Sequence, residues 1–123
     1  MFNFEKLEVW QKAIDFADLI YNETPRFPAE ERFGLTNQLR RAAVSISSNI
    51  AEGSSRSSKT DFARFTEIAA GSVFEAVSQA FISRRQSFLN EQQFRGLYGN
   101  AEELCRMLSG LRKSLLSTLN SQL

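Results

Sequence analysis

The two prolines of this chain, Pro25 and Pro28, lie close together, and the 95 residues that follow contain no proline. Proline removes a backbone donor and clashes with the preceding turn of a helix, so long helices need stretches that lack it. The rest of the chain is therefore free to form long helices, with a break near the two prolines. A length of 123 residues fits one domain around one packed core.

Apolar residues recur at spacings of three and four in four segments, which is the pattern of amphipathic helices. The pattern predicts helices over about residues 7–22, 36–52, 59–87 and 91–119. The last segment has the most regular repeat, formed by Leu97, Ala101, Leu104, Leu108, Leu111 and Leu115. Such a seam packs helices at a shallow angle. Because the connections are short and no strand pattern competes, we predict an all-α, up-down-up-down four-helix bundle as a single domain over residues 1–123.

Three polar residues stand where helices are expected to begin. Thr36 can cap the second helix, because its side-chain oxygen can accept a hydrogen bond from an amide that has no partner in the first turn. Ser58, with Asp61 three positions later, resembles a capping box with Asp in place of Glu. Asn90 precedes the fourth helix in a second arrangement of this kind.

The chain contains no histidine and a single cysteine, Cys105. Without histidine, catalytic triads and zinc motifs built on that residue are excluded. A lone cysteine can form neither an internal disulfide nor a cysteine-rich metal cluster, which favours a reduced, cytoplasmic protein. Cys105 lies beside Leu104 and Leu108, so we interpret it as core filler rather than a nucleophile. We expect no catalytic residue, no metal and no cofactor.

The net charge of +1 gives one copy of the chain no strong field for attracting nucleic acid or a membrane. The charge is uneven, however. Residues 1–35 carry four basic and seven acidic side chains, a balance of −3, and residues 36–123 carry eleven basic and seven acidic ones, a balance of +4. No window approaches the roughly 20 apolar residues that cross a bilayer, so we expect no membrane partner.

Basic residues beyond position 50 are the candidates for nucleic-acid contact. We single out Arg56, Lys59, Arg64, Arg84 and Arg85. They form no continuous run, and a solvated face explains most of them. In a ring of several copies, a modest local excess would be repeated and could become a basic surface. Residues 53–59 also offer amides, hydroxyls and two cations that could hold a phosphate, although an ordinary capped turn is the preferred interpretation.

The phenylalanines exceed what one slim bundle readily buries. Those in question are Phe2, Phe4, Phe16, Phe27, Phe33, Phe74, Phe81 and Phe88. Exposed aromatic patches usually mark surfaces that bind a partner. We therefore expect some of these rings to lie between subunits of an oligomer.

Four segments carry a resemblance to a known family. They read LEVWQKA at residues 7–13, FPAEERFGLTNQLRRA at 27–42, SISSNIAEG at 45–53 and IAAGS at 68–72. In this order and spacing, they resemble the four-helix-bundle family named after proteins encoded in intervening sequences of large-subunit ribosomal RNA genes. That family also includes the accessory variability determinant proteins of diversity-generating retroelements. The resemblance spans about residues 4–119.

The resemblance implies a four-helix bundle that assembles into a homopentameric ring, occurs in bacteria and has no known catalytic activity. In the retroelement branch the ring binds nucleic acid and a reverse transcriptase through basic surfaces. The family motifs contain residues that we expect to be structural or to lie at an interface: Trp10, Arg40, Arg41, Asn49, Glu52, Gly53, Gly71 and Glu75.

Some of these motif residues allow two interpretations. Asn49, Glu52 and Gly53 either form a polar site at the rim of a ring or, as we prefer, have a structural role, in which the Asn and Glu satisfy loop amides or fix the register between subunits. Arg40 and Arg41 point in adjacent helical directions, so at most one of them can face inward. A buried or interfacial pair between Arg41 and Glu75 is a further hypothesis, because a buried charge needs a partner.

Three functions follow from the sequence, in order of preference. The first is a non-enzymatic, cytoplasmic, self-assembling bundle, a pentamer by resemblance, that binds RNA or a nucleoprotein complex. The second is a structural ring that binds another protein through its acidic first segment. The third, which we favour least, is an enzyme that uses Glu52 or Glu67.

Overall fold

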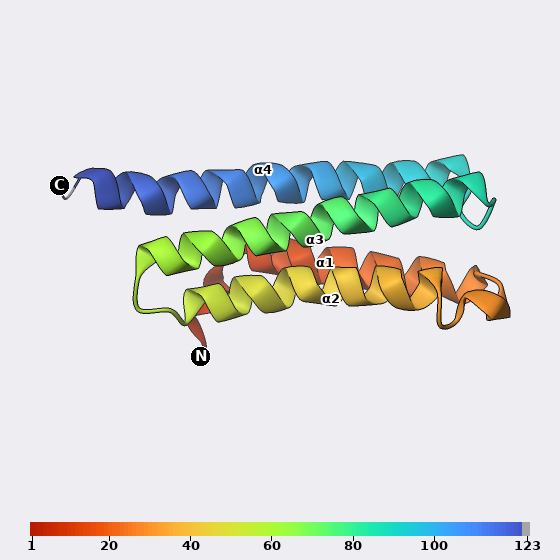
Figure 1. The fold of residues 1–123 in the computed structure, drawn as a ribbon, viewed down its shortest axis with the longest axis horizontal. Coiled ribbons are helices and arrows are strands. Elements are labelled where there is room, and N and C mark those ends of the chain that lie inside the picture. The colour runs from red at the N-terminus through yellow and green to blue at the C-terminus, as the bar shows by residue number, and fades with distance from the viewer. Residues whose placement is uncertain (122–123) are drawn as a thin grey trace.

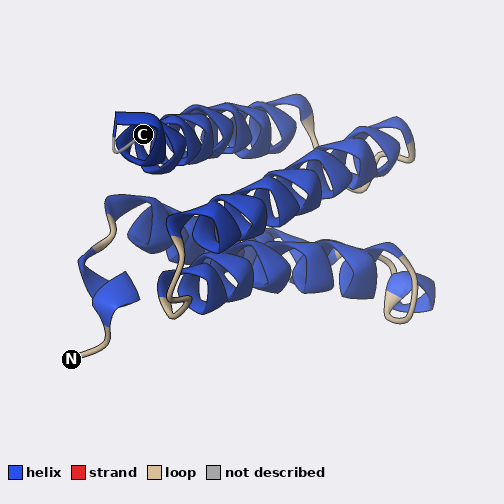
Figure 2. Cartoon of the chain, turned by 60° about the vertical axis from the view of Figure 1, so that its left-hand side comes forward, coloured by secondary structure: helices blue, strands red, loops and turns tan. Residues whose placement is uncertain are grey.

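The computed structural model describes the backbone of residues 1–121 and the side chains of residues 1–117. It contains four α-helices: α1 (Glu8–Glu23), α2 (Leu35–Ser54), α3 (Lys59–Arg85) and α4 (Glu91–Ser121). Three short 3₁₀-helices precede or join them: η1 (Asn3–Lys6), η2 (Thr24–Arg26) and η3 (Ala29–Glu31). Within residues 1–121 there is no strand (Figure 2). Each α-helix begins and ends within two residues of the predicted bounds.

Successive helices run antiparallel, so the chain goes up, down, up and down (Figure 1). Each helix packs against the next one in the sequence, and α1 also packs against α4. These contacts confirm the all-α, four-helix arrangement. The helices α3 and α4 lie close together at the end where a short turn joins them, and they diverge toward the end that carries the α2–α3 loop (Figures 1 and 2).

The core follows the predicted apolar spacing. In α4, four residues of the predicted apolar repeat are buried, namely Leu97, Ala101, Leu104 and Leu108. The other two, Leu111 and Leu115, are half-buried. Between α2 and α3 the buried positions are mostly small, including Ala43 and Ala69. These small side chains let the two helices approach closely, and the Ser45 and Ser72 hydroxyls form a hydrogen bond of 2.9 Å between them.

Two of the three predicted helix caps are present. The Ser58 hydroxyl accepts a hydrogen bond from the Asp61 amide at 3.0 Å. Asn90 and Gln93 form a reciprocal capping box, in which each backbone amide donates to the other side chain at 2.8 Å. Both caps satisfy amides that have no partner within the helix.

The predicted Thr36 cap is wrong. The helix α2 begins at Leu35, and the side chain of Glu31 accepts the Leu35 amide at 2.9 Å. The preceding 3₁₀-helix η3 ends at Glu31 and brings this carboxylate to the first turn of α2. A carboxylate there also interacts favourably with the positive end of the helix dipole.

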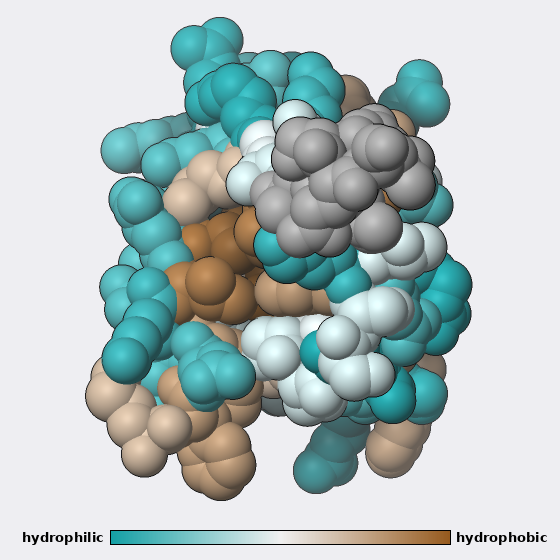
Figure 3. Space-filling model, turned by 90° about the vertical axis from the view of Figure 1, so that its left-hand side faces the viewer, coloured by the Kyte–Doolittle hydropathy of each residue, from teal (hydrophilic) through white to brown (hydrophobic). Residues whose placement is uncertain are grey.

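The end of the bundle that carries the α2–α3 loop presents hydrophobic atoms between hydrophilic rims (Figure 3). This is the end at which α3 and α4 diverge. No helix in the described part of the chain combines the length and the hydropathy that a bilayer span requires.

Candidate functional site

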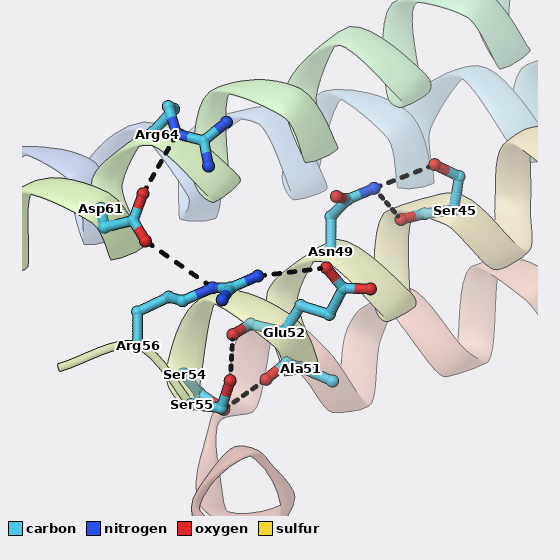
Figure 4. A network of polar contacts seen from close by, with 9 residues as sticks. All are labelled: Ser45, Asn49, Ala51, Glu52, Ser54, Ser55, Arg56, Asp61 and Arg64. Atoms are coloured by element: carbon cyan, nitrogen blue, oxygen red, sulfur yellow. Dashed lines mark hydrogen bonds and ion pairs between the residues drawn. The ribbon is translucent and has the colours of Figure 1, made fainter.

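The α2–α3 loop and the two helix ends that it joins carry five charged residues, which we term the loop cluster: Glu52, Arg56, Lys59, Asp61 and Arg64. Figure 4 shows the contacts among four of them, Glu52, Arg56, Asp61 and Arg64. Arg56 pairs with Glu52 at 3.8 Å and with Asp61 at 3.7 Å, and Arg64 pairs with Asp61 at 3.1 Å. The two guanidinium groups also lie over the Phe65 ring, at 4.6 and 4.8 Å from its centroid. Carboxylates therefore already offset two of the three positive charges.

Backbone groups at this loop are also engaged. The Ser54 and Ser55 hydroxyls donate to the carbonyl oxygens of Ala51 and Glu52, each at 2.7 Å, and so satisfy the end of α2. The Ser58 cap occupies an amide at the start of α3. These contacts support the interpretation of residues 53–59 as a capped turn rather than a phosphate site.

Gly53 is required by packing. A Cβ atom at this position would lie 2.7 Å from Phe62 Cδ1 and 2.8 Å from Phe65 Cβ, closer than atoms of this kind approach. Asn49 has a local role, because its side-chain amide donates to the Ser45 carbonyl at 2.8 Å and to the Ser45 hydroxyl at 3.0 Å. Both residues therefore have local structural roles within one copy of the chain.

The other two nucleic-acid candidates lie at the far end of α3. Arg84 pairs with Glu91 at 2.6 Å and lies over the Phe94 ring at 4.8 Å. Arg85 is exposed. Arg64 and Arg84 are separated by 20 residues of one helix, about 30 Å at 1.5 Å per residue. One copy of the chain therefore does not bring the five candidates to a single surface.

Among the family-motif residues of α1 and α2, Trp10 and Arg40 pack against neighbouring side chains, whereas Arg41 faces solvent. Trp10 is half-buried against the Phe4 ring, with 4.9 Å between centroids. The Arg40 Nε atom donates to the Thr24 hydroxyl at 2.9 Å, and its guanidinium lies over the Tyr21 ring at 4.6 Å. Arg41 is exposed, so one of the two adjacent arginines faces inward, as expected.

The hypothesis of a buried Arg41–Glu75 pair is wrong for one copy of the chain. The hydrogen bonds between Ser45 and Ser72 and between Gln38 and Gln79 bracket these residues and place them on facing turns of α2 and α3. Both are exposed, and among the described residues no ion pair joins them. The Glu75 carboxylate instead accepts a hydrogen bond of 3.3 Å from the side-chain amide of Gln79.

A surface groove lies between α3 and α4. Its main hollow has a volume of about 400 Å³ and is lined by Phe74, Val77, Tyr98, Ala101, Glu102, Cys105 and Arg106. A second hollow of about 290 Å³ shares Phe74 and Cys105 with the first and continues along the groove to Glu67 and Arg112. These last two residues form an ion pair of 2.6 Å across it. We call the two hollows together the α3–α4 groove.

The walls of the α3–α4 groove are mainly apolar, and Phe74 is 70% exposed beside it. Sequence reasoning missed this groove, although one signal was present: Phe74 and Tyr98 fall outside the apolar stripes of their helices. Of the eight phenylalanines singled out above, the structure leaves four exposed: Phe2, Phe33, Phe74 and Phe81.

Cys105 is half-buried in this groove rather than fully inside the core. Burial, with a smaller contribution from the Glu102 carboxylate, raises the pKa of its thiol. The reactive thiolate is therefore scarce near neutral pH. Within residues 1–121 no group of three acidic or cysteine side chains is placed to hold a metal ion.

Comparisons with known proteins identify relatives of the whole bundle. A sequence profile of the family described as 23S rRNA-intervening sequence protein matches residues 5–110. The crystal structure of a protein of unknown function from the S23 ribosomal protein family of Bacteroides thetaiotaomicron matches with a TM-score of 0.79 and 24% identity. That alignment covers 85% of this chain and 98% of the other one. Among curated proteins, none matches this chain. At this identity the crystal structure supports the fold alone.

Proposed function

The chain belongs to the 23S rRNA-intervening sequence protein family, and on this basis we propose that it is a non-enzymatic, oligomeric bundle that binds RNA or a ribonucleoprotein complex in the cytoplasm. The profile match over residues 5–110 is the observation that carries the proposal. No cofactor and no membrane are part of it.

The α3–α4 groove supports self-assembly. Exposed apolar surface costs about 25 cal/mol for each Å² that stays in contact with water, so a large apolar patch favours association. Phe74 stands beside the groove with most of its ring exposed, and Phe81 and Tyr98 continue the aromatic surface along the same two helices. A ring-shaped homopentamer is the form of assembly that the family resemblance implies.

Light scattering of the purified protein tests the assembly. We expect a particle several times the mass of one chain, and we expect Phe74→Ser to shift it toward single chains. Phe33→Ser is the matched control, because Phe33 is 86% exposed but does not line the groove. A monodisperse monomer of the unsubstituted protein at micromolar concentration would contradict the assembly.

RNA binding is supported by cations that remain available. Among the candidates, Lys59 and Arg85 are exposed and make no ion pair in the described part of the chain. In an assembly each of them is repeated, so weak contacts add through effective concentration. The affinity for structured RNA should fall steeply as salt rises, because bound phosphates release counterions.

A titration with structured RNA at two salt concentrations distinguishes this function from the alternative. Binding at low salt that weakens at high salt supports an RNA module. Absence of binding at low salt favours a scaffold ring for a protein partner. That alternative is supported by the acidic residues exposed on α1 and near it, which include Glu8, Asp15, Asp18 and Glu30.

The non-enzymatic part of the proposal is supported by the state of the groups that an enzyme would use. Glu52 is paired with Arg56, and Glu67 with Arg112. The raised pKa of Cys105 keeps its thiol protonated. Together with the absence of histidine from the sequence, these contacts leave few groups for acid–base or nucleophilic chemistry.

A further inference from the structure

A separate hollow, lined by residues of α1 and α2, contains two neighbouring arginines. It has a volume of about 530 Å³ and is lined by Tyr21, Asn37, Arg40, Arg41, Val44 and Ser45. We call it the arginine hollow. No carboxylate is among its lining residues.

The two guanidinium groups differ in how they are held. Arg40 is fixed by its hydrogen bond to Thr24 and by the Tyr21 ring beneath it. Arg41 is exposed and makes no hydrogen bond, ion pair or ring contact with the described residues. One cation is thus positioned in advance, and the other is free to close on a ligand.

This arrangement contrasts with the loop cluster and with Arg84. In those places a carboxylate already lies within 4 Å of each arginine, so an added anion would have to displace it. In the arginine hollow neither arginine forms an ion pair within the described residues, and Glu75, on the facing turn of α3, accepts a hydrogen bond from the Gln79 side chain. Two like charges that share a hollow without a counterion repel each other, and an anion bound between them offsets that repulsion.

We propose that the arginine hollow binds a backbone phosphate of RNA. Guanidinium groups bind phosphate oxygens through pairs of parallel hydrogen bonds, a geometry that lysine does not offer. The half-buried Asn37 adds a side-chain amide that makes no hydrogen bond within the described chain. The hollow is open to the surface, so it can receive a phosphate that is joined to nucleotides on both sides. This assignment rests on the proposed RNA function and places the contact on residues outside the five candidates from the sequence.

The test compares two variants that each remove one positive charge. Arg41→Gln alters the arginine hollow, and Lys113→Gln is the control, because Lys113 is an exposed residue of α4 that does not line the hollow. A labelled RNA hairpin is titrated by fluorescence anisotropy at several salt concentrations, with the full-length protein. We expect Arg41→Gln to weaken binding about tenfold, the loss of one charge-assisted contact. We also expect the slope of log affinity against log salt to become shallower by close to one unit.

Lys113→Gln should change the affinity less than twofold. Arg41→Lys should restore part of the affinity, because it keeps the charge and loses the paired hydrogen bonds. Thermal unfolding of Arg41→Gln should show no loss of stability, since the exposed side chain makes no hydrogen bond, ion pair or ring contact with the described residues.

Two results would overturn the assignment. If the unsubstituted protein binds RNA and Arg41→Gln binds equally well, the hollow is not the site, and the RNA function stands without it. If Arg41→Gln and Lys113→Gln weaken binding equally, only the net charge matters. The hollow is then not the site, and the RNA function again stands without it. If the unsubstituted protein binds no RNA at low salt, the proposed function fails as well. Binding of an acidic peptide that depends on Arg41 would then assign the hollow to a protein partner.

Discussion

At the scale of single residues, two glycines have opposite environments. Gly53 lies where α2 passes the first turns of α3, and a methyl group there would meet Phe62 and Phe65. Gly71 lies on the exposed face of α3 with no atom within 4 Å of where its Cβ would be. One glycine is needed for close packing, and the other only weakens its helix.

Substitution by alanine should therefore have opposite effects at these two positions. Gly53→Ala should lower the free energy of unfolding by about 1 to 3 kcal/mol, the usual cost of overpacking. Gly71→Ala should raise it by about 1 kcal/mol, because alanine favours a helix. Urea unfolding measures both. A loss of particle mass in Gly71→Ala, without a loss of stability, would place Gly71 at a subunit interface.

The raised pKa of Cys105 gives a pH-dependent prediction. Because burial holds the folded-state pKa above the ordinary value, the thiol stays protonated to higher pH in the folded protein. Alkylation by iodoacetamide at pH 8 should be slower in the folded than in the unfolded protein. The unfolded thiol is the stronger acid, so its ionisation should reduce stability as pH rises above the ordinary pKa. Cys105→Ser should remove this decrease, and an identical decrease in that variant would assign it to other groups.

At the scale of elements, the starts of α2, α3 and α4 each depend on one side chain that accepts a backbone amide. Asn90→Ala removes half of a reciprocal capping box and should lower the free energy of unfolding by about 1 kcal/mol. Thr36→Ala should have little effect, because Glu31 supplies the oxygen that accepts the first amide of α2. Thermal unfolding of the two variants compares them directly, and a larger loss in Thr36→Ala would contradict the observed cap.

The helices were predictable from the sequence because their signals are local. Apolar spacing and caps such as Ser58 and Asn90 act within one or two turns, so they fix where helices begin and end. The Thr36 cap failed because a competing carboxylate arrives from η3, a short element that has no periodic signal.

The candidate site was less predictable because it depends on pairing between elements. The sequence indicates that Arg56 and Arg84 are basic, but their ion pairs with Asp61 and Glu91 cross loops whose conformation the sequence pattern does not specify. For the same reason, the arginine hollow could not be inferred. Adjacent positions on a helix predict that Arg40 and Arg41 differ in direction, but not that a tyrosine on α1 holds one of them.

At the scale of the whole molecule, the proposed activities lie on different faces. The α3–α4 groove is mainly apolar, and the arginine hollow is cationic. Apolar association is insensitive to salt or strengthened by it, whereas phosphate binding weakens as salt increases. Raising the salt concentration should therefore release RNA while the assembly keeps its mass. Loss of mass in parallel with loss of RNA would indicate that the two activities share a surface.

The divergence of α3 and α4 also determines the angle at which a neighbouring copy would sit. A ring closes only when the rotation from one copy to the next is a whole fraction of a full turn. If a neighbour seats in the α3–α4 groove, the opening between these helices sets that rotation. The exposed ion pair between Glu67 and Arg112 spans the groove and adds little to stability. Glu67→Gln should therefore leave the melting temperature unchanged. If a neighbouring copy seats against this ion pair, the same substitution should change the number of copies in the assembly, which native mass spectrometry counts.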